Sequence, residues 1–175
     1  MRFIVDPFLR WWLRSGRTGW SRFRRDLFER KYLEVPLPSV NSLENIEAAL
    51  GRIKWQGDGP WYLFDCISYP QTTWVRKKDD CDGFASLAAE LLSRWKPEYA
   101  PVLLTAGVWP IPASHTVCVF AADQGEMCFF DNATLRCESC HTYAEIVPKI
   151  TGGNRLICWD VKDPKTLKTI EFHRA

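Results

Sequence analysis

The sequence predicts an α+β domain in which helices come first and an antiparallel sheet follows. Apolar residues recur at helical spacing as far as about residue 95, and short runs rich in β-branched residues begin at residue 102. A Gly-containing loop at 123–125 joins two of these runs as a hairpin would. Helices followed by strands are typical of an α+β fold, and 175 residues suffice for one domain with a terminal extension.

The N-terminal part is predicted to be separate from the main domain. Residues 1–38 would form a helical extension and linker, and residues 39–175 the domain itself. A helix is expected over 7–15, because Asp-Pro suits its start and Ser-Gly its end. A second helix is expected over 21–32, and the two prolines within 35–38 then favour extended backbone.

The charge of the chain is uneven. Residues 1–34 hold nine Arg or Lys against four Asp or Glu, a balance of +5, with Trp and Phe interleaved. Such a segment suits a membrane surface, a nucleic acid or an acidic protein partner, although the sequence holds no specific nucleic-acid motif. The interpretation that we favour is simpler: a helical extension packed on its own domain with its Arg side chains in water.

Composition predicts a packed core and a reducing environment. Hydrophobic residues make up 46% of the chain. No stretch is long and apolar enough to span a bilayer, and the N-terminus lacks the apolar block and cleavage site of a secretory signal. We therefore expect a cytoplasmic protein whose seven cysteines are mainly thiols.

The main domain is predicted to open with a short helix and a loop region. Asn41 and Glu44 resemble a capping box, and Gly51 would stop the helix that they open. Residues 55–75 hold aromatic side chains among Gly and Pro, which indicates loops and short helical turns. The predicted strands lie further along, at Val102–Thr105, Thr116–Ala121, Met127–Asp131, Leu156–Val161 and Lys168–Phe172.

Cys81 opens the longest predicted helix and is the first candidate for chemistry. Asp79 or Asp80 would cap that helix, which places Cys81 in its first turn, where unpaired N–H groups and the helix dipole favour a thiolate. Asp79, Asp80 and Asp82 oppose a thiolate, so a cationic partner is required, and His115 is the candidate. The apolar positions that define the helix are Phe84, Leu87, Ala88, Leu91, Leu92 and Trp95.

The hairpin around 123–125 predicts a partner for His115. A three-residue loop ending in Gly fits a type I turn with a bulge, which makes Ala122 oppose Glu126. Counting outward from that pair, His115 and Asp131 lie on one face as diagonal neighbours. A two-residue loop would place them on opposite faces. With the three-residue loop, the carboxylate can orient the imidazole.

Together these residues form a candidate catalytic triad. Cys81 would be the nucleophile, and His115 would take its proton and later protonate the leaving group. Asp131 would select the imidazole tautomer and stabilise the imidazolium. A buried Cys and a hydrogen-bonded His at a strand end would be the structural alternative, and the ordered set of three favours the catalytic interpretation.

At this point the chain resembles the transglutaminase-like superfamily, a branch of the papain-like cysteine enzymes. The resemblance rests on Asp80–Ala85 opening a helix, Ser114–Val117 opening a strand and Phe129–Asp131 closing the next strand. It covers roughly residues 60–135, and Tyr69–Trp74 resembles the Pro-containing segment that often precedes the Cys motif in bacterial members. Two positions depart from the family pattern. Where the family usually has Gly two residues before the Cys and an acidic residue two after it, this chain has Asp79 and Gly83.

The resemblance implies acyl transfer at a carbonyl through a thioester with Cys81. Water as acceptor gives a peptidase or amidase, whereas an amine gives a cross-linker. The oxyanion would be held by the Cys81 backbone N–H and one side-chain donor, with Gln71 the first choice and Trp74 or Trp61 the second.

The expected protein is a compact cytoplasmic cysteine hydrolase that cleaves a peptide or isopeptide-type amide and needs no cofactor. Such stand-alone domains occur in bacteria and their phages, so a phage-encoded or virion-associated protein fits the resemblance. The alternative from another class is a catalytically silent interaction protein that docks through residues 1–34.

A second cluster of candidate ligands lies at Cys137-Glu-Ser-Cys140-His141. It matches the short pattern for covalent haem attachment, and it could be half of a zinc site completed by Cys128 or Cys158. Haem attachment needs an export signal and zinc usually a second paired motif, and the sequence shows neither. A loop with thiols, and no metal, is the expected outcome.

Overall fold

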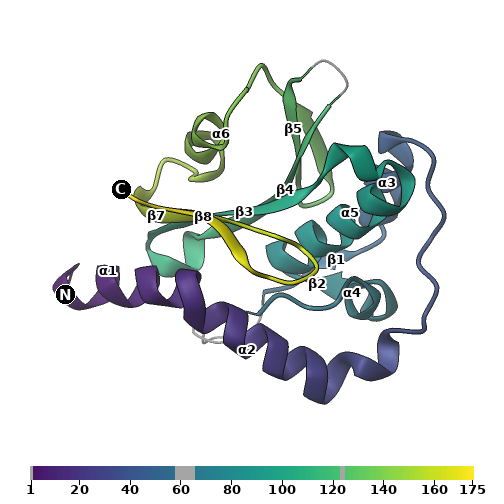
Figure 1. The fold of residues 1–175 in the computed structure, drawn as a ribbon, viewed down its shortest axis with the longest axis horizontal. Helices are drawn as coiled ribbons and strands as arrows, with labels where there is room; N and C mark the ends of the chain where they lie inside the picture. Colours follow the sequence, from purple (N-terminus) through teal and green to yellow (C-terminus); the bar gives the residue numbers. More distant parts are fainter. Residues whose placement is uncertain (1, 58–65, 123–124) are drawn as a thin grey trace.

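The computed structural model describes residues 2–57, 66–122 and 125–175 and confirms the α+β class. A six-stranded antiparallel sheet has the strand order β6-β5-β4-β3-β7-β8, and a small parallel pair joins β1 to β2 (Figure 1). The strands are β1 (Lys54–Trp55), β2 (Lys78–Asp79), β3 (Val102–Trp109), β4 (His115–Ala121), β5 (Met127–Asp131), β6 (Thr134–Cys137), β7 (Arg155–Lys162) and β8 (Thr169–Arg174).

The described helices fall into an N-terminal run and a set of later elements. The run comprises α1 (Arg2–Trp11), η1 (Trp12–Gly16), α2 (Arg17–Arg24), η2 (Arg25–Glu29) and η3 (Arg30–Tyr32), and is called the N-terminal helix below. The later helices are α3 (Leu43–Leu50), α4 (Pro70–Arg76), α5 (Cys81–Trp95) and α6 (Tyr143–Ile150), with 3₁₀ turns η5 (Pro97–Tyr99) and η6 (Ile111–Ala113). No helix among the described residues is long and apolar enough to cross a bilayer.

Helices cover both faces of the large sheet. On one face, α6 packs on β3, β4 and β5 through a buried apolar cluster that includes Leu104, Val117 and Phe129. On the other face, α5 packs through a cluster that includes Leu103 and Phe130. Figure 1 shows α6 on one side of the sheet and the N-terminal helix on the other, the side of α5.

The N-terminal helix approaches β3 and β7 closely. Leu9 and Leu13 pack against Ile157 and Cys158. A Cβ on Gly107 of β3 would lie 2.7 Å from the Leu13 Cδ1 atom, so a larger residue at Gly107 would push the helix away. α5 and the N-terminal helix therefore share one face of the sheet.

Residues 2–32 form one continuous helical run, so the prediction that Ser15-Gly16 ends a helix is wrong. Gly16 has helical backbone angles, φ −61° and ψ −49°. The buried residues recur every fourth position, and in a regular α-helix such a row drifts around the axis, because a turn takes about 3.6 residues. The π-helical turns η1 and η2 are wider and compensate for the drift. The buried row is Leu9, Leu13, Arg17, Ser21, Arg25 and Glu29.

That buried row is mostly polar, and it corrects in part the expectation that the Arg side chains face water: Arg17 and Arg25 are buried, whereas other Arg residues of the helix are exposed. Arg25 Nε and Nη2 donate to the backbone oxygens of Ile67 (2.8 Å) and Ser68 (2.7 Å). Burial lowers the pKa of Arg25 to about 10, so the guanidinium remains charged near neutral pH. Glu29 accepts hydrogen bonds from the Tyr69 backbone N–H and the Thr72 hydroxyl. Each of these contacts fixes the helix in one register along the domain.

Most other predicted elements are present with small shifts. The helix before Gly51 is confirmed, but its cap is Ser42 rather than Asn41, because the Ser42 hydroxyl accepts from Asn45 N–H at 3.2 Å. All five predicted strands are present. β6 was not predicted, since it is a short and largely exposed strand that follows a tight turn at Asn132, where φ is +52°.

Candidate active site

Cys81 is the first residue of α5, as the sequence predicts. Of the two candidate caps, Asp80 is the one used: its carboxylate accepts a hydrogen bond from the Asp82 backbone N–H at 3.1 Å. Cys81 is partly exposed, and its Sγ lies 3.9 Å from Asp82 Oδ1. The thiol therefore stands at a helix start, where the helix dipole favours negative charge.

Asp79 has a different role, and it depends on Gly83. Its carboxylate accepts hydrogen bonds from the Thr73 hydroxyl at 2.6 Å and from the Asp80 backbone N–H at 3.0 Å. A Cβ on Gly83 would lie 2.1 Å from the Asp79 Cγ atom. Asp79 thus occupies the space that a side chain at position 83 would need. The residues at positions 79 and 83, two before and two after Cys81, therefore depend on each other sterically.

His115 and Asp131 are in contact, as the hairpin register predicts. Cys118 pairs with Phe130 and Ala121 with Met127, while Ala122 N–H donates to the Glu126 oxygen at 2.8 Å. Gly125 has the positive φ, +77°, expected at the end of the three-residue loop. The result is a hydrogen bond of 2.7 Å between His115 Nε2 and Asp131 Oδ1.

Two cationic or donor groups hold the Asp131 carboxylate. The hydrogen bond from His115 lowers the pKa of this carboxyl from its ordinary value, and the nearby charge of Arg136 adds to the effect. Arg136 Nη2 lies 3.3 Å from Asp131 Oδ2. Asp131 is therefore ionised near neutral pH and binds Nε2, which leaves Nδ1 as the imidazole nitrogen for proton exchange.

Cys81 and His115 line the same cleft, whose volume is about 230 Å³. The cleft lies where β3 ends and β4 begins, since the connection Ile111–Thr116 forms one wall. The turn after α6 forms another, and the N-terminal helix contributes a third. The side chains from that helix are Leu9, Trp12, Leu13 and Arg17.

Arg17 counters the acidic residues around Cys81. It is 1% exposed and forms an ion pair with Asp82, which is fully buried. Its Nη1 and Nη2 atoms also donate to Thr105 Oγ1 and Thr116 Oγ1, each at 3.2 Å. Because the guanidinium offsets the Asp82 charge, less of that charge opposes a thiolate at Cys81. Sequence reasoning missed Arg17, since nothing local to residues 14–20 distinguishes a buried Arg from an exposed one.

Within the described residues, one group of potential metal ligands lies close together: Asp80, Cys81 and Asp82. The carboxylates already have other partners, because Asp80 caps α5 and Asp82 pairs with Arg17. The group therefore belongs to the helix start and the Cys81 site.

Two of the predicted side-chain donors for an oxyanion, Gln71 and Trp74, do not line this cleft. Gln71 lines a different hollow, beside Arg25 and Tyr69. Trp74 packs on the α5 core with the Lys77 ammonium over its ring. The third candidate, Trp61, lies outside the described residues. Proximity along the chain misled the prediction for the two residues of α4.

Trp55 lines the cleft with Cys81, as Trp12 of the N-terminal helix also does. It lies on β1 and pairs with Asp79 on β2, two residues before Cys81. The pairing is parallel and joins two-residue strands, so no alternating pattern in the sequence could indicate it. Its indole N–H is a hydrogen-bond donor of the required kind.

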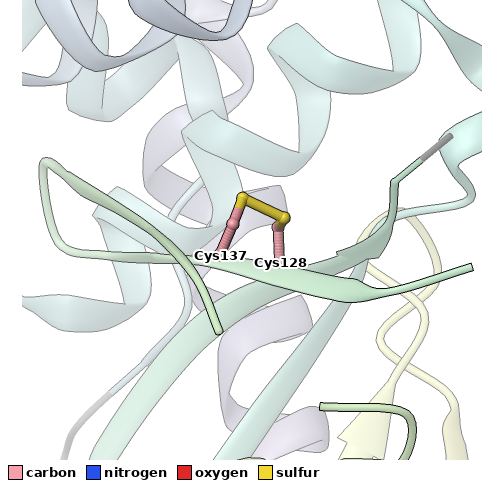
Figure 2. Close-up of a disulfide and its surroundings, with 2 residues drawn as sticks. All are labelled: Cys128 and Cys137. Atoms are coloured by element: carbon pink, nitrogen blue, oxygen red, sulfur yellow. A yellow bond between two sulfur atoms is a disulfide. The ribbon is translucent and has the colours of Figure 1, made fainter. Parts of the chain in front are cut away.

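The candidate metal or haem ligands are not grouped. Cys137 forms a disulfide with Cys128, its cross-strand neighbour in the β5–β6 pair (Figure 2). Neither sulfur can then serve as a thiolate ligand, which corrects the suggestion that Cys137, Cys140 and His141 form a metal half-site or a haem attachment site. The cysteines outside disulfides are Cys66, Cys81, Cys118, Cys140 and Cys158.

Comparisons with known proteins identify fold relatives at low similarity. No protein-family model matches the chain. No curated protein matches it either. Among solved structures, Legionella pneumophila LapG is 15% identical with a TM-score of 0.48, over 97% of this chain and 87% of that one. EGTA-treated LapG is 14% identical (TM-score 0.47, 97% and 85% covered), and calcium-bound LapG is 13% identical (TM-score 0.46, 88% and 82% covered). The likeness is confined to the path of the chain.

Proposed function

We propose that this protein is a cysteine hydrolase of transglutaminase-like type, in which Cys81, His115 and Asp131 cleave a peptide or isopeptide-type amide. One observation carries the proposal. Cys81 at a helix start and His115 line one cleft, and the Nε2 atom of His115 is held by Asp131 at 2.7 Å. A nucleophile, a base and a group that orients the base are the parts that this chemistry requires.

The proposed reaction has two halves. His115 Nδ1 takes the Cys81 proton, and the thiolate attacks the amide carbonyl carbon to form a C–S bond. The tetrahedral intermediate collapses, the C–N bond breaks, and His115 returns the proton to the leaving amine. Water, deprotonated by the same imidazole, then hydrolyses the thioester to a carboxylic acid and restores the thiol.

Two donors are suited to the oxyanion. The Cys81 backbone N–H lies in the first turn of α5, next to the thiol. The Trp55 indole N–H is the side-chain donor that we assign in place of Gln71, because Trp55 lines the cleft and its strand pairs with Asp79, two residues before Cys81. A Trp55→Phe variant keeps the ring and removes the donor, and we expect kcat to fall about 10- to 1000-fold with little change in KM.

The test of the proposal is the alkylation rate of each cysteine against pH, under limiting iodoacetamide, with peptide mass spectrometry as the readout. Cys81 should react faster than the other thiols near pH 6, and His115→Ala should remove that lead. Cys66 is the matched comparison: it is also beside a cation, Arg24, but is buried. Burial raises the pKa of Cys118 and Cys158, the latter to about 12, so both should stay unreactive.

If Cys81 reacts no faster than Cys66, or keeps its lead in His115→Ala, the thiolate–imidazolium pair is absent and the proposal fails. If Cys81 does react faster and loses that lead in His115→Ala, the next step is to screen a pool of dipeptide amides and isopeptide-linked lysines as substrates. The apolar wall formed by Leu9, Leu13 and Ile111 favours substrates with an apolar side chain next to the scissile bond.

A further inference from the structure

The side of the N-terminal helix turned away from the sheet is rich in exposed apolar residues. Large apolar side chains in water are unusual when they cluster, because each loses the free energy gained by burial. Trp20 and Phe23 also stack on one another, with 5.7 Å between ring centroids. The set, called the outer face below, is Ile4 (78% exposed), Trp11 (56%), Trp20 (37%), Phe23 (53%), Leu27 (60%) and Phe28 (57%).

Basic side chains lie among these apolar ones. The exposed charged residues over 4–34 are four basic ones against two acidic ones, and the excess is therefore positive. Arg22 donates to the Thr166 backbone oxygen, which brings the exposed Lys165 and Lys168 beside the same side of the molecule. The charged residues of the helix counted here are Arg14, Arg22, Arg30, Lys31, Asp26 and Glu34.

We propose that the outer face docks the protein on an anionic lipid bilayer. Aromatic and aliphatic side chains would enter the headgroup region, while Arg and Lys bind lipid phosphates and carboxylates. The combination of exposed aromatic and aliphatic side chains with an excess of basic ones favours an anionic bilayer over a protein partner. Among the described elements, the N-terminal helix lies at the border of the molecule in the view of Figure 1.

The inner row of the same helix explains why this face is not simply a misplaced core. Arg17, Arg25 and Glu29 are hydrogen-bonded inside the domain, and turning the helix over would break these bonds and leave their buried partners unsatisfied. The register of the helix therefore presents the apolar residues outward in the folded protein.

The test is co-sedimentation of the full-length chain with vesicles of phosphatidylcholine alone, and of phosphatidylcholine with about 30% phosphatidylserine. Binding should require phosphatidylserine and weaken as salt is raised. A Leu27→Ser/Phe28→Ser variant should bind at least about tenfold less tightly. Val75→Ser/Ile170→Ser is the matched control, because these residues are also exposed (41% and 57%) but lie outside the N-terminal helix, on α4 and β8.

Three results would overturn the proposal. The first is no binding to either vesicle. The second is equal loss in both variants. The third is a dimer in analytical ultracentrifugation that Leu27→Ser/Phe28→Ser dissociates, since the occupant of the outer face would then be a second copy of the chain. The readout is independent of Cys81, so failure of the proposed hydrolase activity would leave it intact.

Discussion

α5 and the N-terminal helix lie on the same face of the same sheet, yet they are attached by opposite means. α5 buries apolar residues such as Leu87 and Leu91 against the strands. The N-terminal helix buries Leu9 and Leu13, but further along it buries charged residues such as Arg17 and Arg25 in hydrogen bonds and ion pairs, and the apolar residues of its outer face stay exposed. Apolar contact gives α5 most of its binding free energy, whereas the polar contacts give the N-terminal helix its position.

The difference has a functional side, because the two helices meet at Cys81. Asp82 of α5 pairs with Arg17 of the N-terminal helix. An apolar contact tolerates small shifts, while a buried ion pair with two further hydrogen bonds tolerates few. The N-terminal helix is thus placed with the accuracy that a wall of the proposed active cleft would require.

Breaking the ion pair should have the largest effect. Arg17→Leu leaves the Asp82 charge buried without its counterion, and we expect the free energy of unfolding to fall by about 3–5 kcal/mol. Urea denaturation measures it. In Arg17→Leu/Asp82→Leu most of this loss should return, because no charge is then stranded. The matched control Arg14→Leu, at an exposed site of the same helix, should change stability by less than about 0.5 kcal/mol. An equal loss in the single and double variants would mean that the pair is not what holds the helix.

In the apolar contact of α5, removing a side chain should destabilise the protein strongly, whereas exchanging it for one of similar volume should destabilise it little. Leu87→Ala removes a fully buried side chain and should lower the free energy of unfolding by about 2–5 kcal/mol. Leu87→Met keeps the volume and should cost less than about 1.5 kcal/mol. Arg17→Lys, the equally conservative change in the polar contact, should cost more than Leu87→Met, since Lys cannot reproduce the forked contacts to Asp82, Thr105 and Thr116. Equal tolerance in urea denaturation would remove the contrast between the helices.

The start of α5 offers a smaller, local test. Gly83→Ala should lower the free energy of unfolding by about 1–3 kcal/mol, because the new Cβ and the Asp79 carboxylate cannot occupy the same space. Thermal unfolding would measure the loss. In an Asp79→Ala background, the same Gly83→Ala change should be neutral or stabilising, since Ala favours a helix over Gly. Similar losses in both backgrounds would show that Asp79 is not the obstacle.

The half-exposed pair of His115 and Asp131 should contribute least, and its contribution should depend on pH. Asp131→Asn should cost about 0.5–1.5 kcal/mol at pH 6. The pKa of the Asp131 carboxyl is lowered in the folded state, so its stabilisation is present above the ordinary value of about 4 and lost as pH falls below it. Urea denaturation of wild type and Asp131→Asn should therefore differ at pH 6 and converge toward pH 3. A constant difference across that range would contradict the assigned pKa direction.

The sequence was sufficient for those parts of the molecule where local pattern and packing agree. The start of α5, the strands and the contact of His115 with Asp131 follow from helical spacing, alternation and a three-residue loop. The path of the N-terminal helix could not be predicted in this way, because an Arg at an inward position looks the same in sequence as an Arg in water. Trp55 and the ion pair of Arg17 were equally hidden, since each depends on a partner far along the chain or on a strand too short to show a pattern.

The N-terminal helix depends on contacts with strands far along the chain. The Thr18 hydroxyl accepts a hydrogen bond from Lys162 across 144 positions, and Arg22 binds Thr166 across the same separation. That helix therefore cannot take its place until β7 and β8 have been synthesised. Because it forms a wall of the cleft and supplies the counterion of Asp82, a nascent chain that still lacks β7 and β8 also lacks the finished cleft beside Cys81. The topology thus delays assembly of the cleft until these two strands are made.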